Sequence, residues 1–234
     1  RATSPYFRPL ITRKIEDPTK YPRTVTDTHA HGPDVEAPQR GDVIAGLKLL
    51  AGPSPIGEHW PDLTAAVNWV VDDTFWDRRD PADDIGILLR DPLEANGLRC
   101  LVGQLVKVCS TLGEAPDADY VADPHWSIVQ YLARDCLAIL QSPGDRDGAI
   151  LWVLDESEDL PRSVELREGR SLLVRDIAFG YDIDDDDAHI TANTDPGHGE
   201  PHFFSTSQVR RITSPTTGLT LVDVLFGEPR EHPA

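Results

Sequence analysis

The sequence predicts an α+β protein, in which a helical layer with a short strand is followed by an antiparallel β-rich meander or small barrel. Apolar residues recur at helical spacing from about residue 41 to 145, and beyond residue 149 they alternate with the period of a strand. Proline is frequent before residue 41. We therefore expect an arm over residues 1–40, a mainly helical acidic domain over 41–145 and a β-rich domain over 146–234.

The arm differs from the rest of the chain in both proline content and charge. Residues 1–40 contain six prolines and few apolar clusters, so they favour an extended segment that is ordered only on the acidic body or on a partner. They carry 7 basic and 5 acidic side chains, a net charge of +2. The two following regions carry 7 against 17 and 8 against 18, a net charge of −10 each.

Two shorter helices are predicted at the start of the acidic domain. Asp42 is expected to cap the first helix, which Gly52 and Pro53 end. The second opens near Pro61 and ends before Asp77, and its apolar residues form one stripe. That stripe consists of Leu63, Ala66, Val67, Val70 and Val71.

A short strand and two longer helices complete the acidic domain. The continuous apolar run at residues 85–90, bounded by turn residues, favours a buried strand. Asp91, Pro92 and Glu94 then occupy the N-cap, N1 and N3 positions of a helix that ends at Gly113. Asp123, followed by proline, predicts the same start for a helix that runs to about residue 141.

Six apolar runs, separated by glycine- and proline-containing turns, predict the strands of the β-rich domain. They cover residues 150–154, 163–167, 172–179, 189–193, 202–205 and 219–226.

The composition disfavours several classes of protein. The net charge of −18 repels nucleic acid and anionic membranes and favours basic partners, although acidic usage is also typical of GC-rich genomes and salt-adapted proteomes. No apolar stretch is long enough to span a membrane, and the first residues lack the layout of a secretion signal. The three cysteines form no C-x-x-C pair, and we expect them to be reduced residues of the hydrophobic core. We expect a soluble cytoplasmic protein.

Two histidine-containing segments are candidate metal sites. Asp27, His29 and His31 match a D-x-H-x-H metal-binding pattern, but the residues before them make a poor buried strand, so a solvated arm with incidental histidines is the preferred interpretation. The D-P-G-H-G turn at residues 195–199 resembles the turn that supplies a zinc ligand in N-acetylmuramoyl-alanine amidases. With it, the candidate zinc ligands are His189, His198, Glu200 and His202. The alternative is an ordinary hairpin turn with exposed histidines.

Five aspartates precede His189 and resemble a calcium loop only superficially. Asp187 occupies the position where an EF-hand needs glycine, and Asn193 occupies the position of the bidentate glutamate. A solvated acidic loop is therefore the expectation.

The middle of the chain resembles a group of small, acidic actinobacterial proteins without an established activity. The resemblance covers about residues 42–141 and depends on residues 71–77, Asp80 with Pro81, residues 85–95 and residues 118–126. It implies a common helical scaffold and transfers no catalytic residue. Proteins of this kind resemble immunity or antitoxin partners in general character.

The leading hypothesis is a non-catalytic acidic binding protein that engages a basic protein partner, as an immunity- or antitoxin-like protein or as a subunit of a larger assembly. It needs no cofactor and excludes direct binding to nucleic acid. Tryptophan anchors and aspartates are expected to face the partner, although core packing is the usual role of tryptophan. These candidate residues are Trp60, Asp72, Asp73, Trp76, Asp77, Asp80, Asp83, Asp84, Asp182, Asp184, Asp185, Asp186 and Asp187. The alternative hypothesis is a zinc-dependent hydrolase that uses His189, His198, Glu200 and His202.

Overall fold

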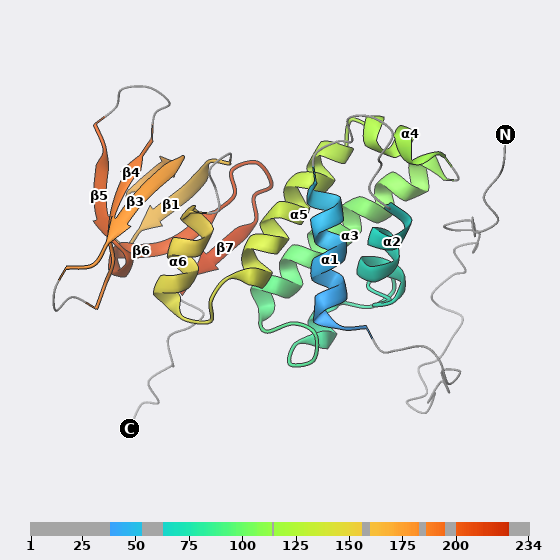
Figure 1. Cartoon of the computed structure of the whole chain (residues 1–234), viewed down its shortest axis with the longest axis horizontal. Helices are drawn as coiled ribbons and strands as arrows, with labels where there is room; N and C mark the ends of the chain where they lie inside the picture. Colours follow the sequence, from blue (N-terminus) through green and yellow to red (C-terminus); the bar gives the residue numbers. More distant parts are fainter. Residues whose placement is uncertain are drawn as a thin grey trace.

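The computed structural model describes residues 38–52, 63–113, 115–155, 160–182, 186–194 and 200–224. In these residues a helical region is followed by two antiparallel sheets that are not closed into a barrel, which confirms the α+β class (Figure 1). The predicted arm, up to residue 37, lies outside the described residues. No described helix is both long and apolar enough to cross a membrane.

In the helical region, α5 packs against both α1 and α3, and it lies on the side of this region that is nearer the sheets (Figure 1). The helices are α1 (Arg40–Ala51), α2 (Leu63–Val67), α3 (Pro92–Leu112), α4 (Asp117–Ala122), α5 (Trp126–Gln141) and α6 (Arg146–Asp155). A π-helical turn, η2 (Asn68–Asp72), continues α2, and a 3-10 turn, η3 (Pro81–Asp84), precedes α3.

The predicted start of α3 is confirmed, with one change in the role of Glu94. The Asp91 carboxylate accepts hydrogen bonds from the backbone N–H groups of Leu93 and Glu94 at 2.8 and 3.0 Å. Glu94 does not complete a capping box, because its carboxylate is fully buried and accepts from Arg40 and Arg90 instead. Gly113 ends the helix at φ 61°, a backbone conformation that favours glycine.

Small residues let the helices approach closely. A Cβ at Gly46 of α1 would lie 2.8 Å from a Val70 methyl and 3.1 Å from the Ala66 carbonyl oxygen. A Cβ at Gly97 of α3 would lie 3.2 Å from the Cys136 sulfur on α5. The close contacts of α1 with α2 and η2, and of α3 with α5, therefore depend on glycine.

The β-rich region contains one sheet of four strands, in the order β2-β1-β6-β7, and one of three, in the order β3-β4-β5. The strands are β1 (Arg162–Leu166), β2 (Ser171–Val174), β3 (Asp176–Gly180), β4 (His189–Asn193), β5 (His202–Ser205), β6 (Val209–Thr213) and β7 (Thr220–Asp223). Val164, Leu172, Ile212 and Val222 pair across the four-stranded sheet and form its buried face.

A buried ion pair connects the helical and β-rich regions. Asp135 of α5 accepts from the Arg162 guanidinium of β1 at 2.6 Å, and both side chains are at most 3 % exposed. The Thr217 hydroxyl, before β7, donates to the second Asp135 oxygen at 2.6 Å. Because α3, α5 and α6 all contact β7, the two regions share one hydrophobic core.

The start of α5 differs from its prediction. Asp123 and Pro124 precede the helix, which begins at Trp126. The Asp123 side chain accepts from the backbone N–H of His125 at 2.7 Å and so shapes the turn before the helix.

The predicted strand at residues 85–90 is wrong. Gly86 has a φ of 87°, and the segment forms a turn with a single isolated bridge between Ile85 and Leu89. The Asp84 carbonyl oxygen accepts from the backbone N–H groups of Ile87, Leu88 and Leu89, so the turn folds on itself and pairs with no described strand.

The predicted strand at residues 150–154 is also wrong, because these residues belong to α6. The Asp145 side chain accepts from the backbone N–H of Gly148 at 2.7 Å and so caps the helix. A short apolar run does not distinguish a strand from a buried helix, and here the cap decides.

Two details of the sheets also differ from the prediction. The apolar run at residues 172–179 divides at Arg175 into β2 and β3, which belong to different sheets. Strand β6 was not predicted, because register shifts at Glu165 and at Ile212 break the alternation of its apolar residues.

Candidate binding surface

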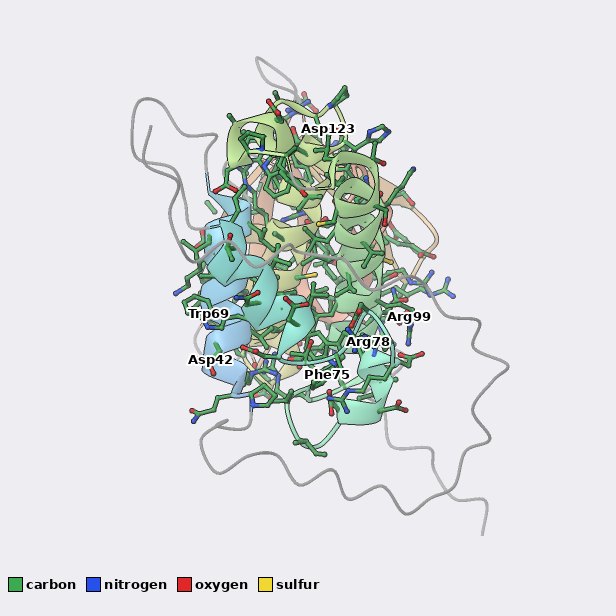
Figure 2. The ribbon with its side chains drawn as sticks, turned by 90° about the vertical axis from the view of Figure 1, so that its right-hand side faces the viewer. Asp42, Trp69, Phe75, Arg78, Arg99 and Asp123 are labelled. Carbon is green, nitrogen blue, oxygen red and sulfur yellow. The ribbon has the colours of Figure 1, made fainter. Side chains whose placement is uncertain are left out.

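The candidate site is the surface formed by residues 72–91, between η2 and the start of α3. We call it the 72–91 surface. In Figure 2, Asp42, Phe75 and Arg78 lie toward one end of the helical region, and Asp123 lies toward the other. The surface combines exposed apolar side chains, exposed carboxylates and a buried polar framework beneath them.

The π-helical turn η2 determines how the chain enters this surface. The Asp73 backbone N–H donates to the Asn68 carbonyl oxygen at 2.8 Å, which is the wide spacing of a π-helix. The Thr74 hydroxyl is fully buried and donates to the Val70 carbonyl oxygen at 2.8 Å. The helix therefore ends with both Asp72 and Asp73 exposed.

A buried network beneath the surface fixes the following turn. The Trp76 indole N–H donates to the Asp84 carboxylate at 2.8 Å, and the Arg79 guanidinium donates to the same oxygen at 2.6 Å. Arg79 also donates to the Thr74 carbonyl oxygen at 2.8 Å. Trp76 is 4 % and Asp84 3 % exposed, so the expectation that both face a partner is corrected: they support the surface from below.

Three exposed apolar side chains project from this framework. Phe75 is 43 %, Ile85 37 % and Ile87 78 % exposed. Phe75 has a φ of 60°, the left-handed conformation that is strained for a bulky L-residue, and its ring faces the Arg78 guanidinium at 5.8 Å. A strained backbone that displays an aromatic ring to solvent is typical of functional positions.

The exposed carboxylates of the surface fall into two groups. Asp77 pairs with Arg78 at 3.1 Å, and Asp80 pairs with Arg99 at 2.6 Å. Asp72, Asp73 and Asp83 form no salt bridge with any residue that the structure describes. These three carboxylates therefore present negative charge that no described basic side chain neutralises.

Burial and neighbouring negative charges shift the pKa values of carboxylates in this surface. Partial burial, followed by the charges of Asp77 and Asp73, raises the pKa of Asp72. Partial burial and the charge of Asp42 raise the pKa of Asp73. The Arg99 hydrogen bond lowers the pKa of Asp80. A cationic group near Asp72 and Asp73 would relieve their repulsion.

The second acidic segment, residues 182–187, is described only in part. Asp182, Asp186 and Asp187 are described, and Asp182 lies 3.5 Å from the His189 ring with its side chain 79 % exposed. Asp184 and Asp185 lie outside the described residues, as does Trp60. The partner-binding role of this segment therefore stays a prediction.

The described histidines of the candidate zinc site do not converge. His189 pairs with Ser205, and His202 pairs with Ala192, so the two histidines lie three positions apart on the β4–β5 ladder and on opposite faces of the sheet. Among the residues described, no three His, Cys, Asp or Glu side chains form a group that could hold a metal ion. His198, and the earlier Asp27, His29 and His31, lie outside the described residues.

The candidate surface residues that sequence reasoning missed are Phe75, Ile85 and Ile87. The tryptophan next to Phe75 was expected to be the exposed anchor, and the positive φ that turns Phe75 outward has no signal in the sequence. The hydrophobicity of residues 85–90 indicated burial, which holds for Leu88 and Leu89 and not for the two isoleucines.

Comparison with known proteins agrees with the resemblance of the middle segment. Residues 38–147 match the model of a family described as a domain of unknown function (DUF7945), so the resemblance to uncharacterised proteins is confirmed. No curated protein and no solved structure matches the chain significantly. The matched region extends from just before α1 to the start of α6 and contains the whole 72–91 surface.

Proposed function

We propose that this is a non-catalytic binding protein that engages a basic protein partner through the 72–91 surface. The observation that carries the proposal is the exposure of Phe75 and Ile87 on two turns that the buried Trp76–Asp84–Arg79 network links. Rigid apolar anchors surrounded by charged groups are the usual composition of a protein–protein contact.

The carboxylates determine the kind of partner. Asp72, Asp73 and Asp83 have no described salt-bridge partner, and the chain as a whole has a net charge of −18. Opposite charge accelerates the encounter with a basic protein, whereas buried apolar anchors slow its dissociation. A basic toxin and a basic subunit of a larger assembly both fit this chemistry.

Affinity capture from the native cell at low salt tests the proposal, with three versions of the full chain as bait. The wild type should retain a basic protein, and Phe75→Ser with Ile87→Ser should weaken its binding by about tenfold or more, because two apolar anchors are lost. Leu173→Ser with Phe203→Ser is the matched control, since both residues are exposed on the sheets.

The charge requirement is tested in the same way. Asp72→Asn with Asp73→Asn should weaken capture, and rising salt should weaken the wild type toward the level of this variant. Glu168→Gln with Asp176→Asn removes two exposed carboxylates from the β-rich region as the control. Equal capture by all four variants, or a captured protein that is acidic, would contradict the proposal.

A further inference from the structure

We infer that residues 6–15 of the same chain occupy the 72–91 surface when no partner is bound, so that the arm competes with the partner. This inference rests on the proposed function, because it assigns the regulation of the same surface. It depends on the composition of these residues, on the place where the chain enters α1 and on the length of chain between them.

The composition of residues 6–15 is complementary to the surface. They contain three cations and no acidic residue, among five large apolar side chains. The cations are Arg8, Arg13 and Lys14, and the apolar residues are Tyr6, Phe7, Leu10, Ile11 and Ile15. The surface offers the opposite charge and apolar side chains of its own, at Phe75, Ile85 and Ile87.

The chain enters α1 next to this surface. The Arg40 guanidinium, in the first turn of α1, donates to the Leu88 carbonyl oxygen at 2.9 Å and to Glu94 at 2.7 Å. The Gln39 backbone N–H donates to the Asp42 carboxylate at 3.1 Å, and the charge of Asp42 in turn acts on Asp73. The first described residues of the chain therefore lie beside the carboxylates of the surface.

The chain between residue 15 and α1 is long enough for residues 6–15 to reach the 72–91 surface. It is also short enough to keep their concentration near that surface high. Residues 16–37 provide 22 residues, which span at most about 75 Å when fully extended. A segment that is tethered to its own binding site through a linker of this length has an effective concentration on the order of millimolar there. Weak attraction is then sufficient for occupancy.

A second copy of the chain is a poorer occupant. Its own 72–91 surface carries the same negative charge, and its helical and β-rich regions each carry a net charge of −10. Apart from the arm, the chain is acidic in both regions, so contact between two bodies brings like charges together.

Zero-length carbodiimide coupling of the full chain tests the inference, because it joins lysine amines to carboxylates only at direct contact. The chain has four lysines, of which Lys14 and Lys20 belong to the arm, while Lys48 and Lys107 are exposed on α1 and α3 and serve as internal references. Peptide mapping should find Lys14 coupled to Asp72, Asp73, Asp77, Asp80 or Asp83 in preference to acidic residues of the β-rich region.

Mixing heavy-isotope and unlabelled chains before coupling distinguishes the occupants. Links within one chain are expected, and links mainly between heavy and light chains would show that a second copy supplies the segment and would overturn the inference. Lys14 links spread evenly over all exposed carboxylates would overturn it as well.

A matched pair of variants tests specificity and keeps Lys14 as the reactive group. Arg8→Gln with Arg13→Gln should lower coupling from Lys14 to the surface about fivefold. Arg167→Gln with Arg175→Gln, two exposed arginines of the β-rich region, should leave it unchanged. If both double variants lost Lys14 coupling equally, net charge alone would explain the loss, and this result would contradict the inference. No partner is needed, so failed coupling leaves the proposed function intact, and failed capture leaves the arm result intact.

Discussion

The helical region and the β-rich region use buried charge differently. In the helical region, Arg40 and Arg90 donate to the Leu140 carbonyl oxygen at the end of α5, and the buried Glu94 carboxylate binds both guanidinium groups. The strands of the β-rich region are held by strand pairing, and β1 contacts α5 through the buried ion pair of Arg162 with Asp135.

The two buried carboxylates therefore have different roles. Glu94 holds elements of the helical region together, whereas Asp135 connects the helical region to the β-rich region. Glu94 accepts four hydrogen bonds that link the chain before α3 to α1 and thereby to the end of α5. Asp135 accepts two that link α5 to β1 and to the turn before β7. We expect the first carboxylate to control the stability of the helical region, and the second to control how the two regions are held together.

The largest effect is expected for Glu94→Gln. The substitution keeps the size of the side chain and removes the charge that Arg40 and Arg90 share, so the free energy of unfolding should fall by about 4 kcal/mol. Urea unfolding measured by circular dichroism checks this value. A loss below about 1 kcal/mol, the range of exposed pairs, would show that the network is not important for stability.

The pH dependence of the same carboxylate gives a second measurement. Burial raises the pKa of Glu94, but the hydrogen bonds from Arg40 and Arg90 lower it by a larger amount. The folded-state pKa of Glu94 therefore lies below the ordinary value of 4.5. The unfolded chain therefore takes up this proton first as the pH falls. The stabilisation should be complete above about pH 5 and disappear as the pH falls through the folded-state pKa. The difference in stability between wild type and Glu94→Gln should shrink over the same range.

Asp135→Asn should cost about 3 kcal/mol, because the buried Arg162 guanidinium loses its carboxylate. Hydrogen exchange resolved by segment sharpens the comparison. Exchange should increase first in β1, β7 and α6, where the two regions meet, while α1 and α3 keep their protection. If α1 lost protection as early as β1, the two regions would unfold as a single unit and the proposed difference between the charges would disappear.

Trp76→Phe should cost about 2 kcal/mol, because Asp84 loses the indole hydrogen bond and retains Arg79. Thermal unfolding gives the loss. Partner capture should fall together with stability, since the network holds the turn that displays Phe75. If the destabilised variant captured the partner as well as the wild type does, the buried network would not be needed to position the binding surface.

The smallest effect has the opposite sign. Phe75→Gly should raise the free energy of unfolding by about 1 kcal/mol, because glycine adopts a φ of 60° without strain. The same variant should bind the partner more weakly, because it lacks the aromatic ring. Ile87→Ser is the control that removes an exposed anchor without relieving backbone strain. A destabilised Phe75→Gly would show that the ring contributes to the fold.

The predicted helices were most accurate where local signals agreed. Asp91, Pro92 and Gly113 fix both ends of α3 through short-range hydrogen bonds and φ preferences, which a sequence displays directly. The apolar stripe of residues 63–71 likewise indicated its buried face correctly. Predictions were wrong at residues 85–90 and 150–154, because a short apolar run has no period long enough to identify its secondary structure.

The sequence indicated that the aspartates of residues 72–83 are exposed, but it did not indicate which aromatic side chain is exposed. The aspartates of residues 72–83 marked an acidic turn, and all of them are exposed. Burial of Trp76 and Asp84 and exposure of Phe75 depend on a hydrogen bond between residues eight positions apart and on one backbone angle. Neither has a local pattern.

The sequence by itself determined the class of the fold, the order of a helical and a β-rich region, the ends of α3 and the excess of negative charge. These properties follow from composition, spacing and contacts between near neighbours. The tertiary structure decided which charges are buried, which apolar side chains remain exposed and how the strands divide between two sheets. Those outcomes depend on contacts such as Arg40 with Glu94 and Asp135 with Arg162, whose partners are brought together only when the whole chain packs.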